Sequence, residues 1–559
     1  MAHLTVKNLS FTYPNAQQNA LDGLSLSIER GEFLTLMGAT GSGKSTFLRL
    51  LKPELRQNGE MEGEILFSAG KATLSHRTSV SGDSSLRKVS LDAMDARTSA
   101  LKIGYVTQNP EEQIVTDKVW HELAFTLENL GVKQGVIARR IAEISSYFGI
   151  DSWMERDTAT LSGGEKQLVN LAAVMTVDPE LLLLDEPTAQ LDPIAAARLI
   201  ETVYRLNRET GVTVIMSEHR CEELFPIADR IVILDKGRIV YDDKPRKVAE
   251  QIGTYSGYEA FLPTAARLFH MVGGKGELPL TVREGQRFAE TLTIADKEST
   301  ETNFNSPDEA LSLKNTGFRY DRRGADILRD LDLTIYKGEV FALLGANGAG
   351  KSTAAAVIAG LKKPYCGTVK LFGRPLKDYK NGSLYREIIS LLPQDTESVL
   401  IRETVGEELK GCEAVLEKLP FDLSGLYDRH PYDISGGERQ LVALCKALST
   451  KPRFLIMDEP SKGLDAHMKD LLLDVIRALK AQGVTILLIT HDVEFAALCA
   501  DRCALFAQGR VAAVESTERF MSDNRFYTTA ASRITRRFVD GAYTAALAAE
   551  RFVTDGGAL

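Results

Sequence analysis

A glycine-rich motif occurs twice in this chain of 559 residues and constrains its fold more than any other feature. It reads GATGSGKST from Gly38 to Thr46 and GANGAGKST from Gly345 to Thr353. Both copies fit G-x-x-x-x-G-K-[ST], a pattern in which glycines let backbone N–H groups turn inward around phosphate oxygens. An apolar run precedes each copy and a helical pattern follows it, so each motif is predicted to join a buried strand to a helix. The repeat therefore predicts two similar α/β domains that each hold a phosphate group.

The side chains of the two motifs indicate a nucleotide with a metal ion. Lys44 and Lys351 are expected to meet the β and γ phosphates, and Ser45 and Ser352 to place a hydroxyl on Mg²⁺. The helix that begins there directs its positive end at the anion. The predicted phosphate-binding residues are Gly38, Gly41, Gly43, Lys44, Ser45 and Thr46 in the first copy, and Gly345, Gly348, Gly350, Lys351, Ser352 and Thr353 in the second.

The composition describes an ordinary folded chain. The apolar fraction is 44%, the charged fraction is 26% and the net charge is −9, so there is no broad cationic field and we expect no nucleic-acid partner. Six cysteines in a chain this long argue against a disulfide framework. We find neither a secretion signal at the start nor an apolar stretch of about 18 residues, so we expect no segment to span a bilayer by itself.

A tyrosine ends the first predicted strand of each half. LTVKNLSFTYP contains Tyr13, and LSLKNTGFRYD contains Tyr320 at the corresponding place. The aromatic ring can stack on a nucleobase from this position, whereas local packing on the strand is the alternative.

A glutamine ends a further predicted strand in each half. Gln108 follows IGYVT and Gln394 follows ISLLP, and both are expected to reach Mg²⁺ or the attacking water. Lys44 and Gln108 are 64 residues apart, whereas Lys351 and Gln394 are 43 apart. The polar stretch at about 68–97 accounts for the difference and predicts a mobile insertion.

A serine-glycine motif is predicted to open a helix in each half. It reads LSGGEKQ from Leu161 to Gln167 and ISGGERQ from Ile434 to Gln440. A helix cap would explain the serine alone. The repeated Gly-Gly-Glu-x-Gln indicates a second phosphate-binding edge, formed by Ser162, Gly163 and Gly164 and by Ser435, Gly436 and Gly437.

Two buried strands end in adjacent acidic residues. A buried carboxylate is costly unless it binds a cation or water, so these acids indicate a functional site. In LLLLDEP and FLIMDEP, Asp185 and Asp458 are placed to hold Mg²⁺ through its water shell. Glu186 and Glu459, which strand alternation would point the other way, are candidates to polarise the attacking water. Later strands end in His219 and His491, and their repetition favours contact with a γ phosphate.

The positions of these motifs predict the domain organisation. The first domain is expected at 1–250 and the second at 310–520. Residues 251–309 are turn-rich and are predicted to be a linker in which TAARLFHM and EGQRFAETL form short helices. A tail at 521–559 has helical stretches of no assigned role.

In both halves the order of phosphate loop, glutamine, LSGGE, Asp-Glu strand, Leu-Asp and histidine resembles the ATP-binding cassette (ABC) ATPases. The resemblance covers most of the chain outside the linker and tail. It implies two P-loop NTPase cassettes, each with a RecA-like core, an antiparallel β subdomain and a helical subdomain. It also implies ATP and Mg²⁺ as ligands and ATP hydrolysis as the reaction.

The same resemblance implies that the two cassettes pair head to tail within the chain. The Ser162 segment would then close over ATP held by Lys351, and the Ser435 segment over ATP held by Lys44. Fusion of the halves makes the effective concentration of the partner high. The second serine-glycine motif and the Leu-Asp segment of the second half differ slightly from the family pattern. It therefore stays open whether both sites hydrolyse ATP at the same rate.

A narrower resemblance concerns QNPEEQIVTDKVWHELAFTLENLG, from Gln108 to Gly131. It is similar to the corresponding segment of energy-coupling-factor (ECF) transporter ATPases, and the second half matches it less well. This resemblance implies a transmembrane coupling subunit, a substrate-binding membrane subunit, and import of a vitamin or transition-metal ion. The chain would then lie at the cytoplasmic face of the cell membrane.

Two alternatives stay open on the sequence. A soluble translation factor with twin cassettes would bind ribosomes, although its usual long charged helical linker is missing at 250–309. A tandem ATPase of a sugar importer shares the chemistry but often carries one impaired site.

Overall fold

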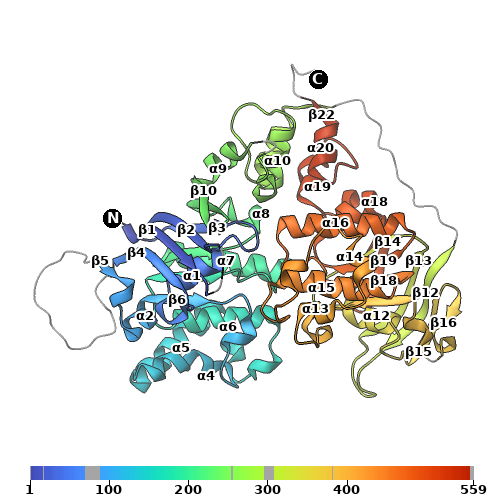
Figure 1. Ribbon diagram of the computed structural model, residues 1–559, viewed down its shortest axis with the longest axis horizontal. Helices are drawn as coiled ribbons and strands as arrows, with labels where there is room; N and C mark the ends of the chain where they lie inside the picture. Colours follow the sequence, from blue (N-terminus) through green and yellow to red (C-terminus); the bar gives the residue numbers. More distant parts are fainter. Residues whose placement is uncertain are drawn as a thin grey trace, which may run out of the picture. The chain divides into compact units, whose positions relative to one another are not determined.

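The computed structural model describes residues 2–14, 16, 18–68, 88–253, 256–294, 308–380 and 382–553. The chain forms two compact units, Met1–Pro263 and Thr264–Leu559 (Figure 1). Among the described residues, every helix is too short or too polar to cross a bilayer. Each unit contains a mixed α/β fold, which confirms the predicted fold class.

The described part of the first unit has a four-stranded sheet of order β2-β1-β4-β5 and a six-stranded sheet of order β10-β9-β3-β8-β7-β6. The strands are β1 (Ala2–Thr12), β2 (Leu21–Glu29), β3 (Phe33–Met37), β4 (Glu60–Ser68), β5 (Lys88–Ser90), β6 (Ile103–Val106), β7 (Leu181–Asp185), β8 (Thr213–Ser217), β9 (Arg230–Asp235) and β10 (Arg238–Asp243). The helices are α1 (Lys44–Leu50), α2 (Ala96–Lys102), α3 (Pro110–Gln113), α4 (Val119–Asn129), α5 (Gln134–Phe148), α6 (Gly163–Met175), α7 (Pro193–Thr210), α8 (Cys221–Leu224) and α9 (Pro245–Ile252).

Burial explains the different sequence patterns of the two sheets. Strands β3, β7 and β8 are buried along their whole length and pair in parallel, so they read as continuous apolar runs. Strand β2 alternates between buried and exposed residues because only one face of the antiparallel sheet is covered. Helix α1 lies between the sheets, where Phe47 and Leu48 join a core that includes residues of both.

The described part of the second unit repeats this arrangement, with sheets of order β13-β12-β15-β16 and β17-β18-β19-β14-β20-β21. Its strands are β11 (Thr293–Ile294), β12 (Glu309–Phe318), β13 (Leu328–Tyr336), β14 (Val340–Leu344), β15 (Cys366–Leu371), β16 (Arg374–Pro375), β17 (Ile389–Leu392), β18 (Phe454–Asp458), β19 (Thr485–Thr490), β20 (Arg502–Ala507), β21 (Arg510–Ser516) and β22 (Phe552–Val553). Its helices are α10 (Thr264–Met271), α11 (Val282–Ala289), α12 (Lys351–Ile358), α13 (Val405–Glu408), α14 (Glu413–Leu416), α15 (Gly436–Ser449), α16 (Ala466–Ala481), α17 (Val493–Cys499), α18 (Thr517–Asp523), α19 (Ala530–Thr535) and α20 (Ala545–Arg551).

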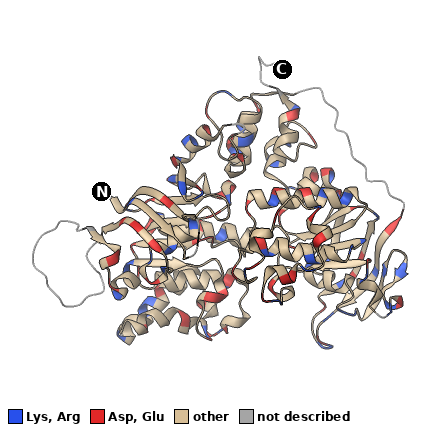
Figure 2. Ribbon diagram, viewed as in Figure 1, with Lys and Arg blue, Asp and Glu red and all other residues tan. Residues whose placement is uncertain are grey.

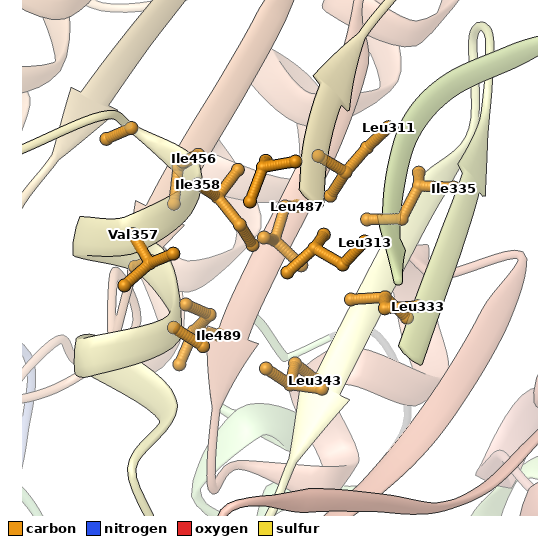
Figure 3. Close-up of a cluster of buried hydrophobic side chains, with 14 of the residues drawn as sticks. Leu311, Leu313, Leu333, Ile335, Leu343, Val357, Ile358, Ile456, Leu487 and Ile489 are labelled. Carbon is orange, nitrogen blue, oxygen red and sulfur yellow. The ribbon is translucent and has the colours of Figure 1, made fainter. Parts of the chain in front are cut away.

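Figure 3 shows the core of the second cassette, in which branched side chains from the two sheets and helix α12 point toward one another. Leu311 and Leu333 come from the antiparallel sheet, Val357 from the helix, and Ile456 and Ile489 from the parallel sheet. All five are buried, so this core fixes the helix after the phosphate loop against both sheets.

The expected linker at 251–309 needs correction in its described part. Helices α10 and α11 pack with α19 and α20 of the tail, and β11 pairs with β22. Leu268, Ile534 and Phe552 are buried in one small apolar cluster that joins these segments. The predicted short helices are present, but residues 264–294 belong to the second unit, where the tail covers their apolar faces.

The expected mobile insertion at 68–97 also needs correction in its described part, residues 88–97. Strand β5 pairs with β4 through Phe67 and Val89, and Leu91 is fully buried. Residues 88–97 are therefore anchored to the antiparallel sheet by burial of apolar side chains among the polar residues. Residues 69–87 lie outside the described residues.

Charged residues of both signs are interspersed along each unit (Figure 2). Neither cassette carries one sign of charge alone, in keeping with the modest net charge of −9.

The cluster around Ile534 predicts a measurable stability effect. Substitution Ile534→Ala removes a fully buried side chain and should destabilise the helical cluster by about 2–5 kcal/mol. Amide hydrogen exchange in the full chain should become faster in α10, α11 and α19. Ile294→Ala, at a residue 51% exposed on β11, is the matched control and should leave exchange unchanged. Equal protection in Ile534→Ala and the unmodified chain would contradict this description of the tail.

Candidate functional site

Parallel strand pairing brings the predicted motifs of each cassette to one edge of its large sheet. In the first unit, β3 runs into the phosphate loop, β7 ends at Asp185 and β8 ends at Ser217. Carboxyl ends of parallel strands meet at the same edge, which is where open α/β sheets bind ligands. Strands β14, β18 and β19 repeat this layout in the second unit.

The phosphate loops need glycine for space and for backbone conformation. A Cβ at Gly38 would lie 2.3 Å from the carbonyl oxygen of Leu234, and one at Gly345 would lie 2.2 Å from that of Phe506. Gly43, at the start of helix α1, has a φ of 101°, in the region that glycine adopts without strain. The loop can therefore keep its shape only with these residues.

Each loop lysine is buried and turned toward its own loop. Lys44 Nζ donates to the carbonyl oxygens of Gly38 at 2.8 Å and Ala39 at 3.1 Å. Lys351 makes the same bonds to Gly345 and Ala346, at 2.7 and 3.1 Å. Two cations with matching surroundings thus stand at the two predicted phosphate sites.

Asp185 lies in a cage of hydroxyl groups at the end of β7. Ser45 Oγ donates to Oδ1 at 2.8 Å and Ser217 Oγ to Oδ1 at 2.9 Å, while Tyr105 Oη donates to Oδ2 at 2.9 Å. Burial raises the pKa of Asp185, and the hydroxyl donors oppose that effect. The cage thus supports a negative charge at a site removed from water.

Glu186 follows the end of β7 in a left-handed turn, with a φ of 43°. Its orientation is set by this turn, not by the strand alternation that the sequence suggested, and Glu459 repeats the turn with a φ of 52°. Such conformations are strained for residues other than glycine and gather at functional sites. The strain is present in both cassettes.

Glu186 is surrounded by three of the predicted residues. His219 Nε2 lies 3.0 Å from Oε1, Lys44 Nζ lies 3.5 Å from Oε1, and Gln108 Nε2 donates to Oε2 at 3.1 Å. Burial alone would raise the pKa of Glu186, but His219 and Lys44 together lower it to about 2. The carboxylate is therefore ionised and lies between Lys44 and His219.

The second cassette assembles a similar but less connected site. His491 Nδ1 lies 2.9 Å and Lys351 Nζ 3.8 Å from the carboxylate of Glu459. Asp458 Oδ1 has no hydrogen-bond partner within the described ranges, and burial raises the pKa of Asp458 to about 6. Gln394 is exposed, and no hydrogen bond joins it to Glu459 in the part of the chain that the structure describes.

The serines of the two signature motifs cap helices, as predicted. Ser162 is the N-cap of α6 and Ser435 is the N-cap of α15, each in a capping box with the glutamate three residues later. A Cβ at the next residue, Gly163 or Gly436, would meet no atom within 4 Å. Internal packing thus does not require these glycines, and the helix ends are open to a ligand.

The two strand tyrosines lie beside the phosphate loops. Tyr13 Oη is 2.9 Å from Thr46 Oγ1, and Tyr320 Oη is 3.2 Å from Thr353 Oγ1. Tyr320 is 62% exposed, and Lys362 Nζ lies 5.6 Å from the centre of its ring.

Several polar residues at these sites were not predicted from the sequence. Tyr105 and Ser217 complete the cage of Asp185, and buried Glu122 and Glu408 each accept bonds from two backbone N–H groups of a loop. A polar residue inside an otherwise apolar strand is the signal that marks Tyr105 and Ser217.

Together, a phosphate loop, a lysine beside a buried acid pair and a glycine-rich helix end in each unit define a P-loop ATPase with two cassettes in one chain. The ABC transporter family model matches residues 21–189 and 328–462. A Bacillus anthracis protein, provisionally described as an ABC transporter ATP-binding protein, is 40% identical over 97% of both chains. A Streptomyces avermitilis protein of the same description is 34% identical over 91% of this chain and 92% of its own.

The chain therefore belongs to the ABC transporter family and is an ATPase of that family. A solved structure of CbiO1 from Clostridium perfringens, part of the ABC transporter complex CbiONQ, is 24% identical over 46% of this chain and 97% of that chain. Its TM-score of 0.37 is too low to bear on function.

Proposed function

We propose that this chain is the ATP-hydrolysing subunit of an ECF-type membrane importer for a vitamin or transition-metal ion. Partner membrane subunits would form the path and recognise the substrate. The observation that carries the proposal is the arrangement of lysine, acid and histidine that both cassettes repeat. In the first cassette, the hydrogen bond from Gln108 to Glu186 connects this arrangement to an exposed loop. The resemblance of Gln108–Gly131 to ECF ATPases supports the importer type.

The residues present suit a magnesium nucleotide. Asp458 Oδ1 and Glu459 Oε1 are buried acid oxygens with no hydrogen-bond partner in the described residues, the condition of groups that serve a cation or its water shell. We assign metal binding to Ser45, Asp185 and Gln108 in the first site and to Ser352, Asp458 and Gln394 in the second. Mg²⁺, when bound, would neutralise charge on the phosphate oxygens.

Catalysis is assigned to the acids that follow the metal-binding aspartates. Glu186 and Glu459 would orient and polarise the attacking water, and His219 and His491 would contact the γ phosphate. A Glu186 carboxylate with a pKa of about 2 is a weak base. If a phosphate group draws Lys44 away, the carboxylate loses one of the two neighbours that lower its pKa and becomes a better proton acceptor.

The double substitution Glu186→Gln with Glu459→Gln tests this assignment. It keeps the size of both side chains but removes the carboxylates, so ATP binding should persist while phosphate release falls by at least about 100-fold. Filter binding and a phosphate-release assay measure the two effects. Undiminished hydrolysis would reject the role of both residues.

We further propose that each ATP is completed by the signature helix of the other cassette. The open helix ends at Gly163 and Gly436 suit a phosphate group, since each offers N–H donors and a positive dipole. Pairing of the cassettes within one chain would need no second copy.

The loop after Gln108 is suited to pass motion to a partner. Helix α6 holds it through Gln167, which donates to the carbonyl oxygen of Thr107 at 2.9 Å, and through Asn170, which donates to that of Pro110 at 3.0 Å. Beyond it, Glu122 accepts from the N–H groups of Val115 and Thr116 at 3.1 and 2.9 Å. This loop, held by helix α6 and Glu122, is called the braced loop. A change in the position of Glu186 could thus move the braced loop through Gln108.

The braced loop presents an apolar residue to solvent in both cassettes. Val115 is 62% exposed and Ile401 is 77% exposed, and each precedes its bracing glutamate, Glu122 or Glu408, by seven residues. Apolar side chains that recur at matching places in both cassettes are candidates for contact with a protein partner. We propose that these residues contact the transmembrane coupling subunit, with the chain at the cytoplasmic face, where ATP is supplied.

The double substitution Val115→Asp with Ile401→Asp tests the docking proposal. Both side chains are exposed, so folding and ATP binding should be unaffected, while a charge placed at an apolar contact should reduce recovery of partners at least about tenfold. Copurification of integral membrane proteins from detergent-solubilised membranes measures the recovery.

Val240→Asp, at an exposed apolar residue of β10, is the control and should copurify membrane proteins like the unmodified chain. Equal recovery by all variants would reject the docking site. Association with ribosomes in place of membrane proteins would reject the importer itself.

A further inference from the structure

We infer that Tyr105 and Ser217 are positioning residues that hold Asp185 for magnesium binding, and that the second site lacks this support. The two ATP sites would therefore differ in the Mg²⁺ concentration that they need. This inference rests on the proposed function, because it assumes that Asp185 and Asp458 serve a magnesium nucleotide.

Strand register shows that the two cassettes differ at corresponding positions. Tyr105 pairs with Leu183 across β6 and β7, whereas Leu391 pairs with Ile456 across β17 and β18. Leu183 and Ile456 both lie two residues before the metal-binding aspartate. Leu391 thus occupies the place of Tyr105.

The strand on the other side of the aspartate, β8 or β19, also carries a polar residue in the first cassette and an apolar residue in the second. Asp185 pairs with Ser217, whereas Asp458 pairs with Ile489. Figure 3 shows Ile489 among the apolar side chains of the second core. The backbone is the same in both cassettes, since Glu186 N donates to Ser217 O and Glu459 N to Ile489 O. Only the side-chain hydroxyl is lost.

In the first site, hydroxyl groups donate hydrogen bonds to both carboxylate oxygens of Asp185. Tyr105 Oη donates a hydrogen bond to Asp185 Oδ2 at 2.9 Å. Ser217 Oγ accepts from the N–H of Glu186 at 2.9 Å and donates to Asp185 Oδ1, so it fixes one acid relative to the other. When Ser45 turns toward a metal ion, Tyr105 and Ser217 can still hold the carboxylate.

The second site offers Asp458 no such donors. Oδ1 of Asp458 has no hydrogen-bond partner in the described residues, and Leu391 and Ile489 have no polar side-chain atoms. Hydrogen bonds to a metal-binding carboxylate orient it, and their loss typically lowers metal affinity about 10- to 100-fold. The first site should therefore be loaded at lower Mg²⁺ than the second.

Nucleotide binding at different Mg²⁺ concentrations tests the inference without any hydrolysis. Lys351→Ala leaves only the first site and Lys44→Ala only the second, and the probe is the radiolabelled β,γ-imido analogue of ATP. We expect the first site to reach half of its magnesium-dependent gain in affinity at about tenfold less Mg²⁺. Equal midpoints at the two sites would overturn the inference.

Tyr105→Phe should erase this difference. In the Lys351→Ala chain it should raise the Mg²⁺ midpoint about tenfold and leave the affinity measured in EDTA unchanged, which a general loss of structure would not do. In the Lys44→Ala chain, the matched control, Tyr105→Phe should have no effect.

A midpoint unchanged by Tyr105→Phe in the Lys351→Ala chain would overturn the inference. If Tyr105→Phe also weakens binding in EDTA, Ser217→Ala takes its place and must raise the midpoint in the same chain, or the inference fails. Absence of nucleotide binding in the unmodified chain would instead reject the proposed function, so the two failures are distinguishable.

Discussion

A buried acid pair beside a buried lysine is the interaction on which each cassette depends. Isolated charges in a protein interior are costly, and removal of one partner of a buried pair commonly costs about 3–5 kcal/mol. Lys44 Nζ lies 3.5 Å from Glu186, and Lys351 Nζ lies 3.8 Å from Glu459. The parallel sheet makes this arrangement possible because it brings the phosphate loop and the acid-bearing strand to one edge. A triphosphate would therefore bind at a position where the side chain of Lys44 or Lys351 already supplies a positive charge.

The two cassettes share this framework but differ in their polar connections. In the first, hydroxyl groups surround Asp185, and Gln167 and Asn170 tie the signature helix to the loop after Gln108. In the second, Gln440 takes the place of Gln167, and its Nε2 is buried without a partner among the described residues. The two cassettes thus share the loop lysine and the acid pair, whereas several uncharged polar groups differ.

Much of the fold could be predicted from the repeated motifs because they lie at the ends of strands. Parallel pairing of those strands fixes which motifs lie beside one another. The helix caps at Ser162 and Ser435 and the clustering of Lys44 with Glu186 and His219 were predictable for that reason. Tyr105 and Ser217 were not, because a comparison that looks for residues shared by both halves passes over those that differ.

The helical cluster of linker and tail escaped prediction for a different reason. Its contacts join segments far apart in the chain, as in the 2.7 Å bond from Gln286 Nε2 to the carbonyl oxygen of Arg533. The helices are short, so each has a weak period of its own and is stabilised mainly by packing. Glu186 shows a similar limit, since its left-handed turn is a backbone feature that strand alternation does not reveal.

The number of ATP molecules bound per chain tests the central claim most directly. Equilibrium dialysis should find two sites in the unmodified chain, one after either Lys44→Ala or Lys351→Ala, and none in the double variant. The account would be contradicted if the unmodified chain bound no ATP, or if the double variant still bound two molecules.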